Sequence, residues 1–217
     1  MAAPLRGYEA SLYLIDLTAT NLSLFAANTP MARADDTWQV YYAVNRSNRW
    51  WHPDTDVVVT VTGMIDVPDY TVCHAGGLVR FAEPLEAQAV VTASVWALPI
   101  PSKVGGAHSW SLDATADTHD VTCWDNQDGW REYISVMRGG TASFEKWWRD
   151  PFFIDVIQQT TVLGLEMRGN DEYIYYAYGQ LTSDSVSAAI EGVVEESLSA
   201  QITGAIGYVA ALAEQDV

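Results

Sequence analysis

Short runs of β-branched and aromatic residues, each bounded by turn-forming residues, recur along most of this chain. Residues 57–64 (VVVTVTGM) favour a strand most strongly, and residues 38–44 (WQVYYAV) and 90–98 (VVTASVWAL) have the same character. Such residues suit the pleated, half-buried surface of a sheet. Residues 70–73 and 78–81 are separated by His-Ala-Gly-Gly, which is typical of a β-hairpin turn. The chain is therefore predicted to consist mainly of β-strands.

The second half of the chain continues this pattern. Further strands are predicted at residues 109–113, 121–124, 130–137, 160–167 and 172–178, with turns at residues 125–129 and 168–171. The clearest alternation lies at residues 194–203. Its apolar side chains are Val194, Leu198, Ala200 and Ile202, and the opposite set is Glu195, Ser197, Ser199, Gln201 and Thr203. This alternation predicts a strand with one buried face and one polar face, and Glu195 lies on the polar face.

One α-helix is predicted at residues 141–148, directly after the Gly-Gly pair at 139–140. Phe144, Trp147 and Trp148 have the spacing i, i+3, i+4, which places them on a single apolar stripe of a helix. The Asp-Pro pair that follows is expected to end the helix, because a residue before proline avoids the helical region. The three aromatic side chains are therefore predicted to pack the helix against the sheet.

Together these elements predict a mainly β (α+β) fold: a β-sandwich or split barrel with one flanking α-helix and long loops. The loops at residues 45–56 and 99–106 do not have the composition of domain linkers, and the sequence contains no internal repeat. A single domain covering residues 1–217 is expected. Within it, residues 1–69 are the less certain part, and residues 207–217 form a C-terminal tail.

The charge of the chain is strongly negative. There are 28 acidic and 11 basic residues, for a net charge of −17, and no Lys or Arg follows Arg168. Non-specific affinity for nucleic acid and for anionic membranes comes from Lys and Arg, so the composition argues against both as binding partners. Charged residues make up only 18% of the chain, below the roughly 25% of ordinary soluble domains. Part of the surface is therefore expected to be covered by other copies, although solubility alone also explains the acidity.

No pattern of catalytic or metal-ligating residues is present. The four histidines lack the spacing of a zinc site, and the acidic zone at residues 113–128 lacks the calcium-loop pattern. The sequence contains no nucleophile elbow, phosphate-binding loop or dinucleotide-binding motif. We expect a protein that is not an enzyme and that holds no metal and no cofactor.

The two cysteines and the absence of long apolar segments indicate where such a chain is made. Cys73 and Cys123 are far apart in sequence, so reduced thiols in a cytosolic setting are expected rather than a disulfide framework. No signal peptide and no apolar run of transmembrane length are recognisable. We therefore expect no association with a membrane.

Nine tryptophans leave a second class of protein open. Tryptophans and paired carboxylates would suit a carbohydrate-binding or glycosidase-type β-sandwich. Most tryptophans, however, lie in predicted strands or in the predicted helix, where core packing is usual. Trp50 and Trp51 lie in a predicted loop, and they are candidate subunit contacts because buried tryptophans often anchor interfaces.

Several motifs between residues 70 and 206 occur in a characteristic order. Asp-Gly-Trp at 128–130 precedes GGTASFEKWW at 139–148, and YAYGQLTS at 176–183 precedes GVVEESLSAQITGAI at 192–206. This ordered set resembles the major tail proteins of siphophages, which are tail tube proteins. In that family an Asp-Gly-Trp strand start leads to a G-x-x-S-F-E-x-W segment that opens a helix. The match is weaker over residues 1–69, and the segment after Gly207 has no counterpart.

The resemblance implies a β-sandwich or split barrel whose copies close into hexameric rings. Such rings stack into a tube, contact other tail proteins at its ends, and let genomic DNA pass through without specific binding. It implies a virion tail protein that is assembled in the host cytoplasm, with Glu195 as a candidate lumen residue. A neck or tail-terminator subunit, which forms a single ring, is the alternative within the same class.

Overall fold

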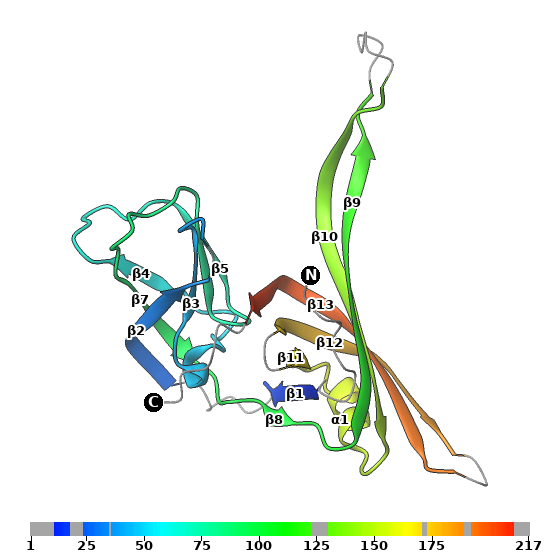
Figure 1. Cartoon of the computed structure of the whole chain (residues 1–217). Helices are drawn as coiled ribbons and strands as arrows, with labels where there is room; N and C mark the ends of the chain where they lie inside the picture. The colour runs from blue at the N-terminus through cyan, green and yellow to red at the C-terminus, as the bar shows by residue number, and fades with distance from the viewer. Residues whose placement is uncertain are drawn as a thin grey trace.

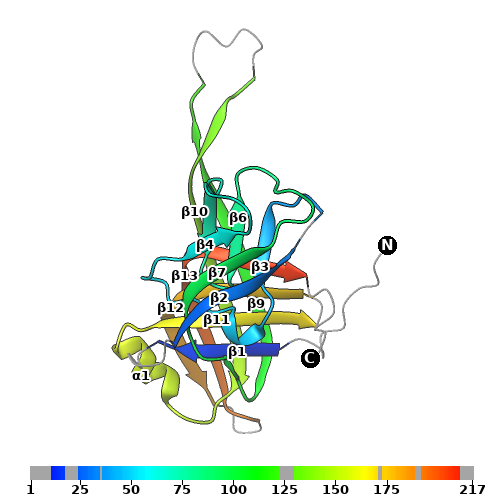
Figure 2. The ribbon, with the colours of Figure 1, turned by 90° about the vertical axis from the view of Figure 1, so that its left-hand side faces the viewer.

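In a computed structural model, the chain forms two antiparallel β-sheets that lie side by side (Figure 1). The structure describes residues 11–17, 24–34, 36–122, 130–170, 173–188 and 192–210. One sheet has seven strands in the order β8-β1-β11-β12-β13-β10-β9, and the other has six in the order β4-β7-β2-β3-β6-β5. Seen from the side of the six-stranded sheet, β2 and β7 cross in front of β11 and β12 (Figure 2).

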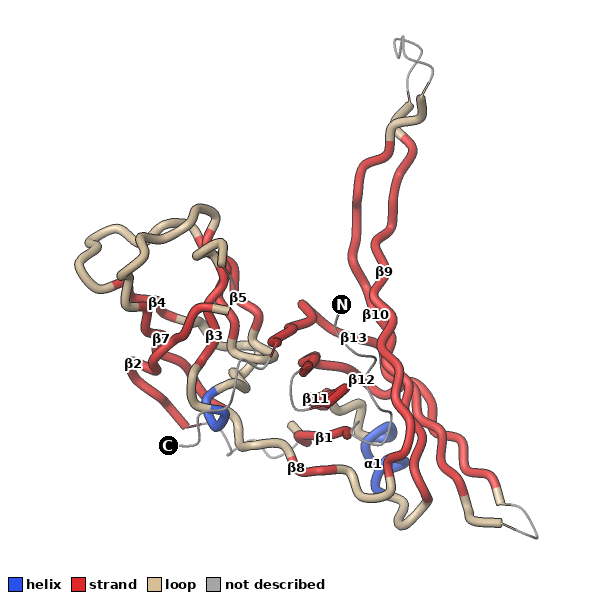
Figure 3. Tube along the Cα trace, viewed as in Figure 1, coloured by secondary structure: helices blue, strands red, loops and turns tan. Residues whose placement is uncertain are grey.

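Strands make up most of the described chain (Figure 3). The seven-stranded sheet contains β1 (Ser11–Asp16), β8 (Ser102–Lys103), β9 (Ala107–Asp120), β10 (Tyr133–Trp147), β11 (Val162–Asn170), β12 (Tyr173–Ser187) and β13 (Glu195–Ala210). The six-stranded sheet contains β2 (Leu24–Arg33), β3 (Val40–Ala43), β4 (Val58–Val61), β5 (Tyr70–Cys73), β6 (Leu78–Phe81) and β7 (Val91–Ala97). The α-helix of the described chain is α1 (Phe152–Gln158), and a short 3-10 helix covers Arg46–Asn48.

The seven-stranded sheet curls around an apolar core. Five of its strands contribute buried side chains to this core, among them Leu12, Phe144, Leu165, Ala177 and Leu198. The curl brings β9 close to β11. A 3.2 Å hydrogen bond from the Trp110 indole nitrogen to the Arg168 carbonyl shows this proximity. Helix α1 packs Phe153 and Val156 into the same core. The sheet is therefore a split barrel with one helix on its side.

The six-stranded sheet has a core of its own, formed by residues such as Tyr41, Val79, Phe81 and Val95. Its two edges also approach each other, since the Tyr70 hydroxyl donates a 3.2 Å hydrogen bond to the Val57 carbonyl just before β4.

The turn between β5 and β6 fits closely against the larger sheet. It contains Gly76 and Gly77, both with positive φ. A Cβ atom on Gly76 would lie 2.8 Å from the Tyr176 ring of β12, so this position needs glycine for its space as well as its conformation.

The structure confirms the predicted fold class, which is mainly β with one flanking helix. Strands β4 and β7 lie within the predicted runs at residues 57–64 and 90–98, and β5 and β6 form the predicted hairpin. The alternation in β13 is also confirmed, since Leu198, Ala200 and Ile202 are buried. The predicted turn at residues 125–129, Cys123 and residues 211–217 lie outside the described part of the chain.

The predicted helix at residues 141–148 is wrong. This segment is the second half of β10, paired on one side with β13 and on the other with β9. Side chains of residues 141–147 alternate with a period of two, so Phe144 is buried, whereas Trp147 is 39% exposed. Trp148 follows the end of β10 and is 41% exposed. The helical spacing of the three aromatic residues was coincidental, because strand pairing on both sides decides the conformation.

The helix begins instead immediately after the Asp-Pro pair that was expected to end one. The N-cap of α1 is Pro151, and the Phe152 backbone nitrogen, at the start of the helix, donates a 3.2 Å hydrogen bond to the Asp150 carboxylate. Proline before or within the first turn favours a helix, because its fixed φ matches the helical conformation. Phe153, Val156 and Ile157 then form the apolar stripe that faces the core.

This correction gives a direct test of the strand. Phe144→Ala is expected to reduce the free energy of unfolding by about 3–5 kcal/mol, because it removes a buried ring from the core. Trp147→Ala is expected to cost at most about 1 kcal/mol, because its side chain lies on the exposed face. Urea denaturation of dilute protein measures both values, and equal losses for the two variants would contradict the assigned strand faces.

Candidate assembly surfaces

The ribbon of β9 and β10 extends well beyond the rest of its sheet (Figure 1). β10 pairs with β13 only from Thr141 to Trp147, whereas its pairing with β9 continues to Tyr133 opposite Asp120. Residues 113–120 and 133–139 therefore form a two-stranded projection, called the arm below, to which no third described strand is added. Every residue in these two segments is exposed. Both faces of the arm are thus open to solvent or to a partner.

The arm carries large apolar side chains although it is exposed. Tyr133, Ile134, Val136 and Met137 lie in it, and Trp130 lies three residues before Tyr133. These five side chains are between 53% and 80% exposed. A two-stranded ribbon is at best marginally stable by itself in water, and contiguous exposed apolar surface marks an interaction site. The arm therefore has the properties of a segment that is covered by another molecule.

A second apolar surface lies on the outer face of the six-stranded sheet, and we call it the outer patch. Phe25 of β2 and Trp96 of β7 are directly paired, with ring centroids 5.3 Å apart. Val58 is opposite Ser94, two residues from Trp96, so it shares the same face. These three side chains and Leu24 are all exposed. In Figure 1 these strands lie on the opposite side of the molecule from the arm.

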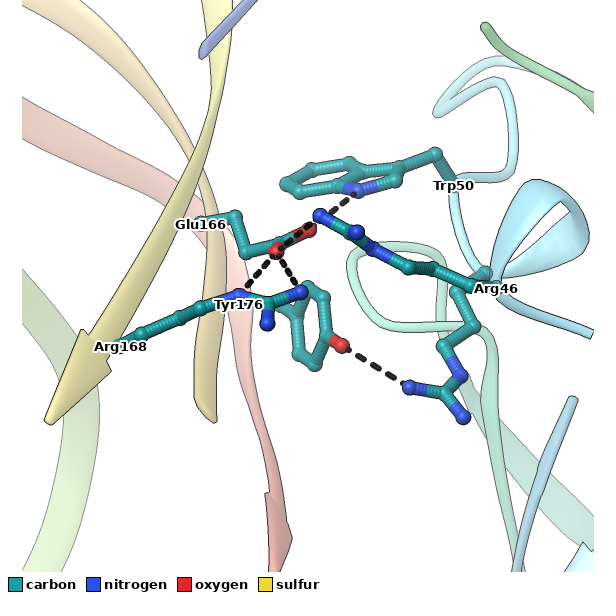
Figure 4. Close-up of polar contacts among 6 residues, drawn as sticks. Arg46, Trp50, Glu166, Arg168 and Tyr176 are labelled. Carbon is teal, nitrogen blue, oxygen red and sulfur yellow. Dashed lines mark hydrogen bonds and ion pairs between the residues drawn. The ribbon is translucent and has the colours of Figure 1, made fainter. Parts of the chain in front are cut away.

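A charged network joins the two sheets (Figure 4). Glu166 of β11 is fully buried, and its Oε1 atom accepts hydrogen bonds from Arg46 Nη2 at 3.0 Å and from Arg168 Nε at 2.8 Å. Its Oε2 atom accepts a 3.4 Å hydrogen bond from the Trp50 indole nitrogen. Arg46 and Trp50 belong to the loop before β4, so one carboxylate ties that loop to the barrel.

A third arginine completes this network. Arg49 donates from Nη1 to the Tyr176 hydroxyl at 3.4 Å and from Nε to the Ala43 carbonyl at 3.1 Å. Burial, the largest single effect, lowers the pKa of Arg168, but Glu166 together with Tyr13 and Tyr176 raises it overall, so this guanidinium stays charged. Burial also raises the pKa of the Tyr176 hydroxyl. Two guanidinium groups, those of Arg46 and Arg168, thus share one buried carboxylate, and Arg49 is joined to the same network through the Tyr176 hydroxyl.

Trp50 and Trp51 were expected to be subunit contacts, and the structure corrects this. Both side chains are completely buried inside the chain. The Trp50 ring packs between Tyr176 and Tyr178, with centroids 5.6 and 5.4 Å away. Trp51 lies in the core of the six-stranded sheet. Their loop runs between the two sheets rather than over the surface, so these tryptophans hold the chain together internally.

Glu195 lies at the start of β13 with its side chain exposed, opposite Trp147 of β10. The next residue, Glu196, is fully buried and forms an ion pair with Lys146. Sequence reasoning passed over Glu196, although it occupies the same alternate position as the buried Leu198. Because Glu196 is two residues from Leu198, the alternation in this strand could have predicted that its side chain is buried.

The described residues bring together no group with an evident catalytic arrangement. Among them, no cluster of three or more His, Cys, Asp or Glu residues has a geometry that can hold a metal ion. No helix in the described segments is both long and apolar enough to cross a membrane. His52 and His74 line a cleft of about 630 Å³ between the sheets, where a His74 ring nitrogen lies 3.1 Å from the Thr55 carbonyl. Burial raises the pKa of the nearby Cys73 thiol to about 12, so this thiol is protonated and unreactive at neutral pH.

No protein-family model matches the chain, and no curated protein matches it either. Several chains of solved structures match this chain, among them the following two. One is a chain from the tail of an empty GTA particle with C6 symmetry: it is 21% identical, with a TM-score of 0.46, over 51% of this chain and 87% of that chain. The other is a chain from the virion of a native gene transfer agent (GTA) particle: it is 22% identical, with a TM-score of 0.43, over 51% of this chain and 89% of that chain. These similarities concern the fold of about half of the chain.

Proposed function

We propose that this chain is a structural subunit of a phage-type tail, whose copies assemble into stacked rings that form the tail tube. The observation that carries the proposal is the arm, an exposed two-stranded ribbon with Tyr133, Ile134, Val136 and Met137 on its surface. The order of the sequence motifs, which resembles that of siphophage tail tube proteins, supports the same function and favours rings of six copies.

The energetics of the arm favour repeated contacts over a single pair. Fully burying one large apolar side chain stabilises by about 1.5–3 kcal/mol, so covering the arm contributes on the order of 5–10 kcal/mol. Bringing two molecules together costs roughly 4–15 kcal/mol in lost freedom of motion. One arm contact therefore roughly balances its own cost. In a closed ring every copy gives one arm and receives another. The last subunit to join makes two contacts but loses its freedom of motion only once.

The placement of the two apolar surfaces favours head-to-tail association. The arm and the outer patch differ in structure and lie on opposite sides of the molecule (Figure 1). A contact between two different surfaces repeats from copy to copy. It produces a closed ring when the rotation that relates successive copies adds up to a full turn. Strand β9 is also an edge of its sheet, and neighbouring copies in a ring cover such edges.

The acidity of the chain suits a conduit for DNA. With a net charge of −17, an inner surface rich in carboxylates repels the phosphate backbone, so DNA passes without being held. Exposed Glu195 is the proposed lumen residue. The proposed partners are further copies of the chain and other tail proteins at the ends of the tube, and the proposed location is the virion tail, assembled in the host cytoplasm.

We also propose that the two sheets act as one domain without enzymatic activity. The Glu166 network and the Trp50 ring connect them through buried contacts, so independent movement would expose charged groups and apolar surface together. A rigid subunit is what a repeating assembly needs, because each contact has to recur with the same geometry.

Sedimentation velocity of the full chain tests this function. Because one arm contact roughly balances its own cost, we expect closed rings and larger species, rather than pairs, to appear as the concentration of the chain is raised. No binding to duplex DNA is expected in a gel-shift assay at physiological salt. A single-chain species at every concentration would overturn the proposal, and salt-sensitive DNA binding would overturn the conduit part of it.

A further inference from the structure

Three charged side chains meet inside the barrel where β10, β13 and β12 run side by side. Lys146 of β10 is directly opposite Glu196 of β13. Asp184 of β12 is opposite Leu198, two residues along β13 from Glu196. Because residues two apart on a strand share one face, the two carboxylates are diagonal neighbours on the interior face of the sheet.

The contacts of these groups leave one carboxylate without a counter-ion. Lys146 Nζ pairs with Glu196 Oε2 and also lies 5.0 Å from the centre of the Phe153 ring of α1. Glu196 is 0% exposed and Lys146 is 4% exposed. The second oxygen of Glu196 and both oxygens of Asp184 are buried and have no hydrogen-bond partner among the described residues.

A single proton resolves this imbalance. With both carboxylates ionised, the cluster has two negative charges and one positive charge in a buried setting, which is unfavourable. A proton on Asp184 removes one negative charge and supplies the missing donor, because the protonated oxygen can donate to the second Glu196 oxygen. The same step satisfies an oxygen of each carboxyl group.

The charges around Asp184 agree with this assignment. Burial raises the pKa of Asp184 most, the adjacent Glu196 carboxylate raises it further, and Lys146 opposes both effects. Lys146 also lines a cavity of about 640 Å³ together with Lys103, Arg149, Asp150 and Asp155. The charges of Lys103 and Arg149 are balanced by those of Asp150 and Asp155. The protonation of Asp184 therefore depends mainly on Glu196 and Lys146.

We propose that Asp184 holds one proton, which it donates in a hydrogen bond to Glu196, and that this pair forms a pH-sensitive clamp within the β12–β13 ribbon. This ribbon comprises residues 182–187 and 195–199, and it projects away from the barrel at the lower right of Figure 1. With the proton bound, the clamp holds the ribbon against β10. Loss of the proton leaves an uncompensated buried charge and loosens the ribbon. The clamp is independent of the proposed function.

The direction of the pH effect follows from the raised pKa of Asp184. The folded chain holds this proton more tightly than the unfolded chain, whose aspartates titrate near 3.9. The contribution of the clamp is fully present below the unfolded pKa and is lost as pH rises through the folded pKa. This is opposite to the usual behaviour of a carboxylate in an ion pair.

Amide hydrogen exchange of the full chain, followed peptide by peptide, tests the clamp. After correction for intrinsic rates, exchange in residues 182–187 and 195–199 is expected to slow severalfold as pH falls from neutral to the ordinary titration range of aspartate, because the bound proton holds the ribbon. Asp184→Asn mimics the protonated acid, so slow exchange at both pH values is expected for that variant. Glu195→Gln, at an exposed position on the same strand, is expected to keep the wild-type pH dependence.

Two results would overturn the clamp. One is wild-type exchange in the ribbon that does not change with pH after correction. The other is the same pH dependence in Asp184→Asn as in the wild type. If the Asn variant does not fold, a carbon-13 titration of the wild-type side-chain carboxyls decides alone: Asp184 has to titrate above the usual range of aspartate, and a midpoint within or below that range rejects the proposal.

Discussion

Glu166→Gln is expected to reduce the free energy of unfolding by about 3–5 kcal/mol, the usual effect of removing one partner from a buried ion pair. The substitution keeps the size of the side chain but leaves Arg46 and Arg168 without their counter-ion at the junction of the sheets. Urea denaturation followed by tryptophan fluorescence measures the loss, because Trp50 and Trp51 report directly on the junction.

Glu195→Gln is the matched control for this variant. It makes the same chemical change on the same barrel, but its side chain is exposed, so a change within about 0.5 kcal/mol is expected. Equal stability of Glu166→Gln and the wild type would contradict the assignment of Glu166 as the buried counter-ion. It would also remove the main argument that the two sheets act as one domain.

Replacing Ile134 and Met137 of the arm by Asp is expected to abolish self-association while leaving the folded chain intact. Both side chains are more than half exposed in the single copy, so little stability is lost on substitution. In an assembly the same positions are covered, so each of the two substitutions removes about 1.5–3 kcal/mol of apolar burial. The concentration needed for association is therefore expected to rise at least about hundredfold in sedimentation velocity.

Met64→Asp with Ile65→Asp is the control for the arm variant. It replaces the same two residue types and adds the same charge, at an exposed loop of the six-stranded sheet. Wild-type association is expected, since this loop belongs to neither the arm nor the outer patch. Equal weakening of association by both double variants would show that net charge, rather than the arm, controls assembly.

The sequence was most informative where one strand face is buried and the other is wet. Runs of β-branched and aromatic residues predicted β4 and β7, a period-two pattern predicted β13, and the Gly-Gly turn predicted the hairpin of β5 and β6. In each case the local preference and the tertiary environment agree, so the pattern in the chain is also the pattern of burial.

The sequence misled where long-range pairing overrides local spacing. Phe144, Trp147 and Trp148 have helical spacing, but pairing with β9 and β13 holds their segment as a strand. Trp50 and Trp51 lie in a loop that the second sheet buries, and no local pattern shows which loop runs between two sheets.

The charged groups of the interior were partly visible in advance. Glu196 occupies an apolar alternate position in β13, and Glu166 and Arg168 are two residues apart, hence on one face of β11. The partner of Glu166 in the other sheet, Arg46, is 120 residues away in sequence. A single sequence contains no signal that joins such distant positions, so the network was found only in the structure.

The central claim, that copies of this chain assemble through the arm, is tested most directly by electron microscopy of the concentrated full chain. The account predicts closed rings or stacked tubes in which the density of each arm lies against a neighbouring copy. Single, unassociated copies at the highest attainable concentration would contradict it, as would rings in which residues 113–120 and 133–139 project into solvent.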